Sequence, residues 1–328
     1  MLAAVLHAYG DPTALILEER PDPVAGEGQV VVDVAAAAIN FPDVLIMADR
    51  YQVSVPLPFI PGSELAGTVR SVGTGVEGVS PGDRVSATVM VGAFAEQVAV
   101  AASSLVPVPA GVDLISAAAL QVTYLTAYHS IVSVAGASPG EWVVVLGAAG
   151  GVGMAAIDIA RQIGCRSIAA VSSDTKAAAC LQRGADAAVR YDEEDMKSRI
   201  REITGGGAGV VVDPVGGPYA EVALRAMRWG GRFVTVGYAS GVIPRIPLNL
   251  VLLKGVTVRG FEMRTFSEHE PEAARRGSAA LMAMVGAGLR PHVSAVLPLT
   301  EAAAGLQAVA ERRSTGKVIL VPQEGGGA

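Results

Sequence analysis

Residues 141–164 read EWVVVLGAAGGVGMAAIDIARQIG. The apolar run from Trp142 to Leu146 has the length and β-branched content of a strand that is buried on both faces of a parallel sheet. A glycine-rich turn follows, and after it apolar residues recur at helical spacing until Gly164, which is placed to end a helix. The stretch therefore predicts a strand, a tight turn and a helix.

This strand, turn and helix are suited to bind the pyrophosphate of a dinucleotide. Glycines allow the backbone to approach the phosphates, and the first turn of the helix offers unpaired N–H groups and the positive end of its dipole. The predicted contacts are Gly150, Gly151 and Val152. The G-x-G-x-x-G pattern is broken at its first glycine, where the chain has Ala148, so an ordinary tight strand-to-helix turn is the alternative.

Length and composition narrow the class of protein. The chain has 328 residues, which predicts two domains at about 150 residues each. A net charge of −6 without a lysine or arginine cluster argues against nucleic acid or an anionic membrane as a partner. Cys165 and Cys180 are the only cysteines, which predicts no disulfide framework and a reducing, cytoplasmic location. Polar residues interrupt the uncharged run from Leu114 to Gly140, which favours a buried helix over a membrane span.

The pattern of turns and periodicities divides the chain into three segments. Residues 1–122 contain short strands separated by Pro-Gly turns, and we expect a mostly β domain there. Residues 123–262 alternate strands with helices, which predicts an α/β domain with a doubly wound parallel sheet. Residues 263–328 are expected to return to the first domain.

Seven short motifs are spread over nearly the whole chain. They are NFPD from Asn40, PGSELAG from Pro61, GDRV from Gly82, TAYH from Thr126, GAAGGVG from Gly147, DPVGG from Asp213 and GKVIL from Gly316. In their order and spacing the sequence resembles the medium-chain dehydrogenase/reductase superfamily, specifically its zinc-free NADPH:quinone oxidoreductase branch. The resemblance implies a GroES-like mostly-β catalytic domain, an inserted Rossmann domain that binds the dinucleotide, and a final return to the catalytic domain.

The sequence predicts no metal site. Zinc relatives in the resembled superfamily carry a cysteine where this chain has Asn40 and a histidine where it has Ser63. The scattered histidines, at positions 7, 129, 269 and 292, do not supply the three or four ligands that zinc needs. Without a Lewis acid to stabilise an alkoxide, we expect reduction of an electron-poor acceptor and not oxidation of a simple alcohol.

The end of the second strand of the dinucleotide-binding domain predicts NADPH as the cofactor. An acidic residue there would bind a ribose 2′-hydroxyl and repel a 2′-phosphate, but this chain has two serines followed by a lysine. By resemblance, the residues that hold this phosphate are Ser172, Ser173, Lys176 and Tyr191. Arg190 is a further candidate. Asp174 opposes the prediction, and a solvated Lys176 is the alternative.

Asn40 and Tyr51 are the residues expected to act on the substrate. The Asn40 amide can hydrogen-bond a carboxamide or an acceptor carbonyl, and in the resembled family this position borders the nicotinamide, as does that of Thr126. Tyr51 matches a family tyrosine near the substrate pocket, where a phenol can orient a quinone oxygen or donate a proton. The alternatives are a helix or turn cap for Asn40 and an ordinary half-buried aromatic for Tyr51. Asp43 is expected to position Asn40 or the adjoining loop, with a helix cap as the alternative, and Glu64 to form a structural ion pair or support the backbone.

Three further residues are predicted to border the crevice that holds the cofactor. Tyr238, Phe261 and Met263 follow strands of the predicted sheet, and an apolar wall suits a flat quinone. Core or dimer contacts are the alternatives for these side chains. The resemblance also implies a homodimer, which the edge from Val256 to Phe261 can form.

The predicted activity is NADPH-dependent reduction of a quinone by direct hydride transfer. Asn40, Tyr51 and water would stabilise the developing oxyanion charge, while the cofactor supplies the chemistry. One alternative is an enone or enoyl-thioester reductase of the same superfamily. A CoA substrate would need cations around the pocket mouth, for which Arg50, Lys254 and Arg264 are candidates, and ordinary surface charge is the alternative for these residues. The other alternative function is an NADPH-binding sensor with little catalysis.

Overall fold

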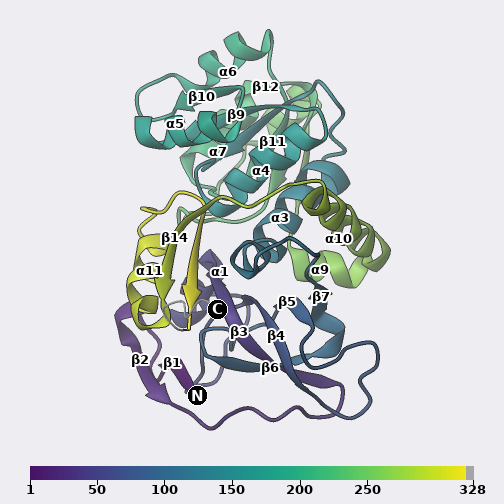
Figure 1. Ribbon diagram of the computed structural model, residues 1–328. Coiled ribbons are helices and arrows are strands. Elements are labelled where there is room, and N and C mark those ends of the chain that lie inside the picture. The colour runs from purple at the N-terminus through teal and green to yellow at the C-terminus, as the bar shows by residue number, and fades with distance from the viewer. Residues whose placement is uncertain (323–328) are drawn as a thin grey trace. The chain divides into compact units, whose positions relative to one another are not determined.

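The computed structural model describes residues 1–322 and divides into two compact units (Figure 1). Unit 1 contains Met1–Val122 and the segment from Val293 onward, and unit 2 contains Thr123–His292. The division therefore falls later than the predicted return at residue 263. The physical reason lies in helix α10 (Pro271–Gly286), which buries Leu281 and Val285 and packs against the segment His129–Val134 of unit 2.

Unit 1 is built on a seven-stranded sheet. Its order is β14 (Val293–Pro298), β15 (Lys317–Val321), β3 (Gln29–Ile39), β4 (Glu64–Val72), β5 (Arg84–Thr88) and β7 (Leu105–Pro107), with β6 (Gln97–Ala101) also paired to β3. Only β14 and β15 run parallel, and the other pairs are antiparallel. Strands β1 (Leu2–Leu6) and β2 (Leu15–Glu19) form a separate hairpin. The mostly β character predicted for residues 1–122 is confirmed.

Short helices complete unit 1. They are α1 (Phe41–Met47), α2 (Leu114–Ala118), α11 (Ala302–Ala310) and the 3₁₀ turns η1 (Pro12–Ala14), η2 (Ala102–Ser104) and η4 (Leu299–Glu301). Strand β3 passes into α1 at Asn40, whose N–H donates to the Asp43 carboxylate at 2.7 Å. This bond supplies a partner at the helix start, and it fixes Asn40 at the junction between the strand and the helix.

Unit 2 contains a six-stranded sheet in which every pair is parallel. Its order is β10 (Ala187–Arg190), β9 (Arg166–Val171), β8 (Trp142–Leu146), β11 (Ala208–Asp213), β12 (Met227–Thr235) and β13 (Thr257–Gly260). Counted from β8 in chain order, this is the 3-2-1-4-5-6 arrangement of a Rossmann fold. The predicted doubly wound sheet is confirmed, and the strand order reverses between β8 and β11, where such sheets bind ligands.

The helices of unit 2 pack in pairs against this sheet. Helix α4 (Gly151–Gln162) contacts α5 (Asp174–Arg183), and α6 (Met196–Thr204) contacts α7 (Pro218–Ala226). Right-handed crossovers on either side of the reversal place the two pairs on opposite faces. The remaining segments are α3 (Gln121–Tyr128), η3 (His129–Val134), α8 (Leu248–Lys254), α9 (Met263–His269) and α10. Among the described residues, no helix combines the length and apolarity needed to span a membrane.

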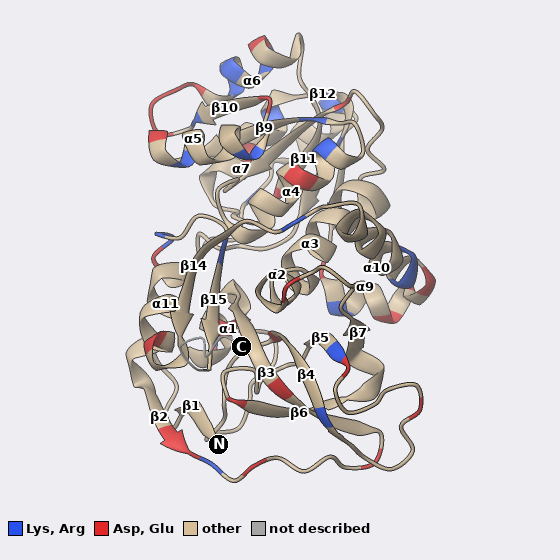
Figure 2. Ribbon diagram, in the orientation of Figure 1, with Lys and Arg blue, Asp and Glu red and all other residues tan. Residues whose placement is uncertain are grey.

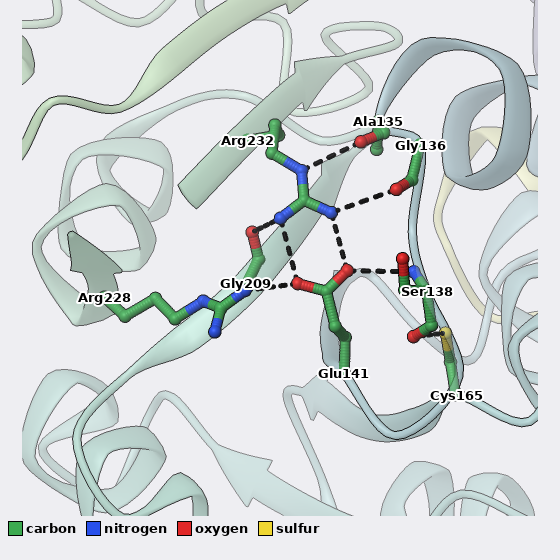
Figure 3. A network of polar contacts seen from close by, with 8 residues as sticks. All are labelled: Ala135, Gly136, Ser138, Glu141, Cys165, Gly209, Arg228 and Arg232. Carbon is green, nitrogen blue, oxygen red and sulfur yellow. Dashed lines mark hydrogen bonds and ion pairs between the residues drawn. The ribbon is translucent and has the colours of Figure 1, made fainter. Parts of the chain in front are cut away.

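The start of β8 is fixed by a charge network around Glu141 (Figure 3). Arg232 of β12 donates from Nη1 to Oε1 at 2.9 Å and from Nη2 to Oε2 at 2.7 Å, and Arg228 adds a second ion pair. The Ser138 N–H donates to Oε2 at 2.9 Å. The hydrogen bonds from Arg232 lower the pKa of Glu141 to about 2. Because β11 lies between β8 and β12, this network ties three strands of the sheet together.

Candidate functional site

The glycine turn after β8 has the shape that a pyrophosphate needs. The chain turns at Gly147, which has a φ of +59°, and α4 begins at Gly151. A Cβ added at Gly153 would lie 2.5 Å from backbone atoms of Ala148, so glycine is required for the helix to approach the turn this closely. No side chain caps α4 at Gly150, and its first turn contains no acidic residue. The predicted contacts therefore lie at an uncapped helix start that fits an anion.

The residues predicted to bind a 2′-phosphate lie together at the carboxyl ends of β9 and β10. Lys176 Nζ donates to Ser172 Oγ at 3.3 Å. Ser173 Oγ caps α5 by accepting the Lys176 N–H at 3.3 Å. The Tyr191 N–H donates to Val171 O at 3.2 Å, which brings the end of β10 beside the end of β9. The Tyr191 ring also packs against Tyr219 with centroids 4.1 Å apart.

Arg190 adds a second cation to this edge of the sheet, but it is surrounded by carboxylates. It forms ion pairs with Asp174 at 2.7 Å, with Asp192 at 3.3 Å and with Glu193. The hydrogen bonds that Arg190 donates, first to Asp174 and then to Asp192, raise the pKa of Arg190 above its ordinary value. Figure 2 shows the acidic and basic segments next to one another around α5 and β10. The edge therefore holds Lys176 and Arg190 together with three negative side chains.

In unit 1, Asn40 lies in a buried polar cluster. Lys317 Nζ donates to Asn40 Oδ1 at 2.6 Å, to Glu64 Oε2 at 3.0 Å and to the Ile39 carbonyl at 3.4 Å. Asn40 Nδ2 donates to Glu64 Oε2 at 3.0 Å and to the Ala38 carbonyl at 3.3 Å. Because lysine only donates and a carboxylate only accepts, these partners fix which side of the amide carries oxygen.

This geometry limits what Asn40 can offer to a ligand. Both amide N–H groups already have acceptors inside the protein, so the free capacity of the amide lies on its oxygen, which accepts one bond from Lys317. This differs from the expectation that Asn40 also donates to an acceptor carbonyl. Glu64 forms a structural ion pair with Lys317, the role that the sequence suggested. It also accepts from Asn40, and its Oε1 accepts the Val122 N–H at 2.9 Å.

Lys317 was not singled out from the sequence. It lies 277 positions from Asn40, and β15 reaches β3 through the pairing of Val318 with Ile39. One signal was available, because a lysine opens the otherwise apolar strand KVILV. A charged side chain that begins a buried strand indicates a buried partner.

Asp43 is the second buried acid of unit 1. Its Oδ2 accepts the Asn40 N–H, whereas its Oδ1 has no hydrogen-bond partner among residues 1–322. Burial raises the pKa of Asp43 to about 6, against opposing contributions from hydrogen bonds and from Lys317. Asp43 therefore supports the backbone of Asn40, as the sequence suggested. Its raised pKa also favours the protonated carboxyl over the carboxylate.

Tyr51 and Thr126 are both half-buried. Tyr51 packs against the apolar core of unit 1, the environment of the alternative that the sequence left open. Thr126 lies on α3 in unit 2. The predicted roles of Tyr51 and Thr126 therefore stay proposals.

The three residues predicted for the crevice wall have different environments within unit 2. Tyr238 follows β12 and is 40% exposed, and Met263 begins α9 and is half-buried. Phe261 is buried, and its ring centroid lies 5.9 Å from that of His129, in a cluster that includes Phe266. The position of Phe261 thus agrees with the core alternative, while Tyr238 remains accessible.

His129 lies at the centre of this aromatic cluster. Its Nδ1 contacts Ser133 Oγ at 2.9 Å, and its Nε2 has no hydrogen-bond partner within the described part of the chain. Burial lowers the pKa of His129 to about 4. A Cβ added at Gly277 would lie 2.2 Å from the ring, so α10 packs directly on it. Across residues 1–322, no three His, Cys, Asp or Glu side chains are grouped so that they could hold a metal ion.

Comparison with known proteins matches both units to one superfamily. The alcohol dehydrogenase GroES-like domain matches residues 26–110, and the zinc-binding dehydrogenase family matches residues 151–279. Mouse quinone oxidoreductase-like protein 2 is 37% identical, over 93% of this chain and 88% of that protein. A 2-haloacrylate reductase from a Burkholderia species is 32% identical, over 98% and 99%. The quinone oxidoreductase of Thermus thermophilus, also solved with NADPH, is 37% identical with a TM-score of 0.86, over 98% of this chain and 100% of that one.

Proposed function

Because this chain belongs to the quinone oxidoreductase branch of the medium-chain dehydrogenase/reductase superfamily, we propose that it reduces quinones with NADPH. It is an oxidoreductase of this superfamily with a site of the NAD(P)H type. The observation that carries the choice of NADPH is the end of β9. There Lys176 and Ser172 lie 3.3 Å apart, at the point where a carboxylate would select the unphosphorylated ribose.

The residues of unit 2 hold the cofactor by its phosphates. The uncapped start of α4, with Gly150, Gly151 and Val152, receives the pyrophosphate through backbone N–H groups. Ser172 and Lys176 receive the 2′-phosphate through a hydroxyl and an ammonium group. When bound, NADPH supplies the hydride, and the protein supplies position and polarity.

In this proposal, residues of unit 1 orient the nicotinamide of the cofactor and the acceptor. Asn40 Oδ1, which Lys317 holds in place, accepts a hydrogen bond from the carboxamide of the nicotinamide. Tyr51 and water then stabilise the negative charge that develops on the acceptor oxygen and deliver its proton. Tyr238, which is exposed after β12, contributes to an apolar wall against a flat acceptor.

A second candidate acceptor is a conjugated alkene. It is favoured by the 32% identity to a 2-haloacrylate reductase over nearly the full length of both chains. An enone or an enoyl thioester would accept hydride at carbon and a proton at the neighbouring carbon, with the same cofactor site. A sensor that binds NADPH without turnover is the remaining possibility for the test below.

The experiment is anaerobic oxidation of NADPH with a panel of quinones and enones, followed by identification of each product. We expect hydroquinone to accumulate in step with NADPH consumption, and we expect a metal chelator to leave the rate unchanged. Turnover of enones alone would replace the quinone proposal with the alkene proposal. Binding of NADPH without reduction of any acceptor would support the sensor, and a chelator-sensitive rate would refute the zinc-free mechanism.

We also propose a homodimer that forms through the β13 edge of unit 2. Within residues 1–322, strand β13 pairs with β12 alone, and large apolar side chains are exposed on β12, on α8 and on β13 itself. They are Trp229, Leu248, Leu252, Leu253 and Val258. Light scattering should give twice the mass of the chain, and Val258→Lys should shift the protein to monomer. A monomeric wild-type protein would refute the proposal.

A cytoplasmic location is proposed from the cysteine chemistry. Cys165 and Cys180 are buried and not joined in a disulfide. Burial raises the pKa of the Cys180 thiol to about 12. The group therefore stays protonated, and oxidation, which requires the thiolate, is slow. Cell fractionation with thiol labelling under denaturing conditions tests this, and recovery in an oxidising compartment would contradict it.

A further inference from the structure

We propose that Asp174 is a specificity-determining residue, which competes with the 2′-phosphate of the cofactor for the guanidinium of Arg190. The inference rests on the proposed NADPH site and adds a residue that opposes it. Asp174 begins α5 directly after Ser173, and its Oδ1 lies 2.7 Å from Arg190 Nη1. This ion pair joins the turn after β9 to the end of β10, so it lies at the same edge of the sheet as Ser172 and Lys176, to which the phosphate is assigned.

The burial of the two partners shows which of them can move. The side chain of Arg190 is 17% exposed, whereas that of Asp174 is 86% exposed. Arg190 is held from its other side by Asp192 and Glu193, which lie on the turn between β10 and α6. Arg190 therefore stays at the edge of the sheet when Asp174 swings into solvent.

The charges of the cluster make this movement necessary for a phosphate. Lys176 and Arg190 carry two positive charges, and Asp174, Asp192 and Glu193 carry three negative ones. A phosphate monoester carries between one and two negative charges near neutral pH. It would meet a cluster with a negative balance unless one carboxylate withdraws.

The donors of Arg190 are suited to the exchange. Its ion pairs engage the two terminal nitrogens, and Nε is buried with no hydrogen-bond partner among the residues described. A guanidinium binds phosphate through two parallel N–H bonds. When Asp174 leaves, the terminal nitrogen that it occupied becomes available to a phosphate oxygen beside Lys176. Asp174 thus lowers the preference of the site for NADPH over NADH.

The test compares the Kd values of NADPH and NADH for four proteins: wild type, Asp174→Asn, Arg190→Gln and the double variant. Asp174→Asn should tighten the binding of NADPH by about twofold to fivefold, as expected for an exposed charge contact, and should change the binding of NADH less. Arg190→Gln should weaken the binding of NADPH and leave the binding of NADH nearly unchanged. In the Arg190→Gln background, Asp174→Asn should lose most of its effect.

Two controls separate the specific competition from general electrostatics. Glu272→Gln on α10 removes the same charge from an exposed residue, 76% exposed and paired with Arg276 within its own helix, and should leave both Kd values unchanged. Adenosine 2′,5′-bisphosphate and 5′-AMP repeat the comparison without the nicotinamide. Asp174→Asn should tighten only the bisphosphate. Thermal unfolding of each variant reports whether it is folded.

The outcomes distinguish this inference from the proposed function. Equal tightening of NADPH and NADH, or an Asp174→Asn effect that persists without Arg190, would overturn the competition while leaving the NADPH site in place. Wild-type protein that binds neither dinucleotide would overturn both. Selective tightening that depends on Arg190 supports the competition.

Discussion

Two ion pairs of similar length, one from each unit, lie in very different environments. Lys317 and Glu64 lie 3.0 Å apart with side chains 3% and 0% exposed, whereas Arg190 and Asp174 lie 2.7 Å apart at 17% and 86%. A buried pair cannot lose one partner without leaving an uncompensated charge, but an exposed pair is weak and exchanges with solvent. Distance alone therefore does not show what a pair does. Burial makes the first a fixed support for Asn40 and leaves the second open to a ligand.

The largest effect is expected from breaking the buried pair. Lys317→Met leaves Glu64 charged inside unit 1 and should lower the free energy of unfolding by about 3–5 kcal/mol. Urea unfolding measures this loss. The double variant Lys317→Met/Glu64→Gln removes both charges and should recover part of it. A loss below about 1 kcal/mol would show that the pair behaves like a surface contact.

The second prediction concerns the pH dependence of the same cluster. Burial raises the pKa of Asp43 from 3.8 to about 6, so the protonated carboxyl favours the folded state. That contribution is fully present below pH 3.8 and is lost as the pH rises through 6. The difference in unfolding free energy between wild type and Asp43→Asn should therefore change by about 2 kcal/mol between pH 4 and pH 8, with wild type losing stability relative to the variant. A constant difference across this range would contradict the buried state of Asp43.

The third prediction separates ligand binding from stability at the start of α4. Gly150→Asp places a carboxylate at the proposed pyrophosphate site and should weaken NADPH by at least about 100-fold. Aspartate is also a preferred N-cap, so the melting temperature should be kept or raised. Gly150→Ala is the matched control. It adds the same Cβ, which would lie 3.3 Å from the Gly147 carbonyl oxygen, but it adds no charge. Unchanged NADPH affinity in Gly150→Asp would refute the pyrophosphate site.

The smallest effect, produced by salt, sharpens the contrast between the two pairs. Raising sodium chloride from about 50 to about 500 mM should weaken NADPH by several-fold and NADH by less, because the exposed cluster is screened. The destabilisation caused by Lys317→Met should change by less than about 0.5 kcal/mol over the same range, since buried charges are screened little. An identical salt dependence for both dinucleotides would show that no exposed cation contacts the 2′-phosphate.

The sequence predicted the architecture of unit 2 because the information was local. The strand, glycine turn and helix of residues 141–164 and the βα units after them led to the parallel sheet that the structure contains. The side chains at the ends of β9 and β10 lie together as the fold predicts, since the position after the second strand is fixed by the fold, and their binding of a 2′-phosphate stays a prediction. The end of unit 2 was placed too early, because the packing of α10 against the segment around His129 has no local signature.

The cluster around Asn40 could be predicted only in part. Glu64 and Asp43 were assigned supporting roles, and both contact Asn40. Lys317 was missed because its contacts to Asn40 and Glu64 span 277 and 253 positions of the chain. Both N–H groups of the Asn40 amide are already bonded within the protein, so only its oxygen can bind a ligand. Which amide atoms are already bonded depends on three-dimensional packing, and the sequence does not show it.

A crystal structure of the complex with NADPH would test most directly how the two ion pairs differ. We predict that the 2′-phosphate contacts Arg190, Lys176 and Ser172, that Asp174 has turned into solvent, and that Lys317 keeps its contacts of 2.6 Å to Asn40 and 3.0 Å to Glu64. A complex in which Asp174 still pairs with Arg190 while the phosphate binds elsewhere would contradict the account. So would a complex in which the buried cluster of unit 1 rearranges.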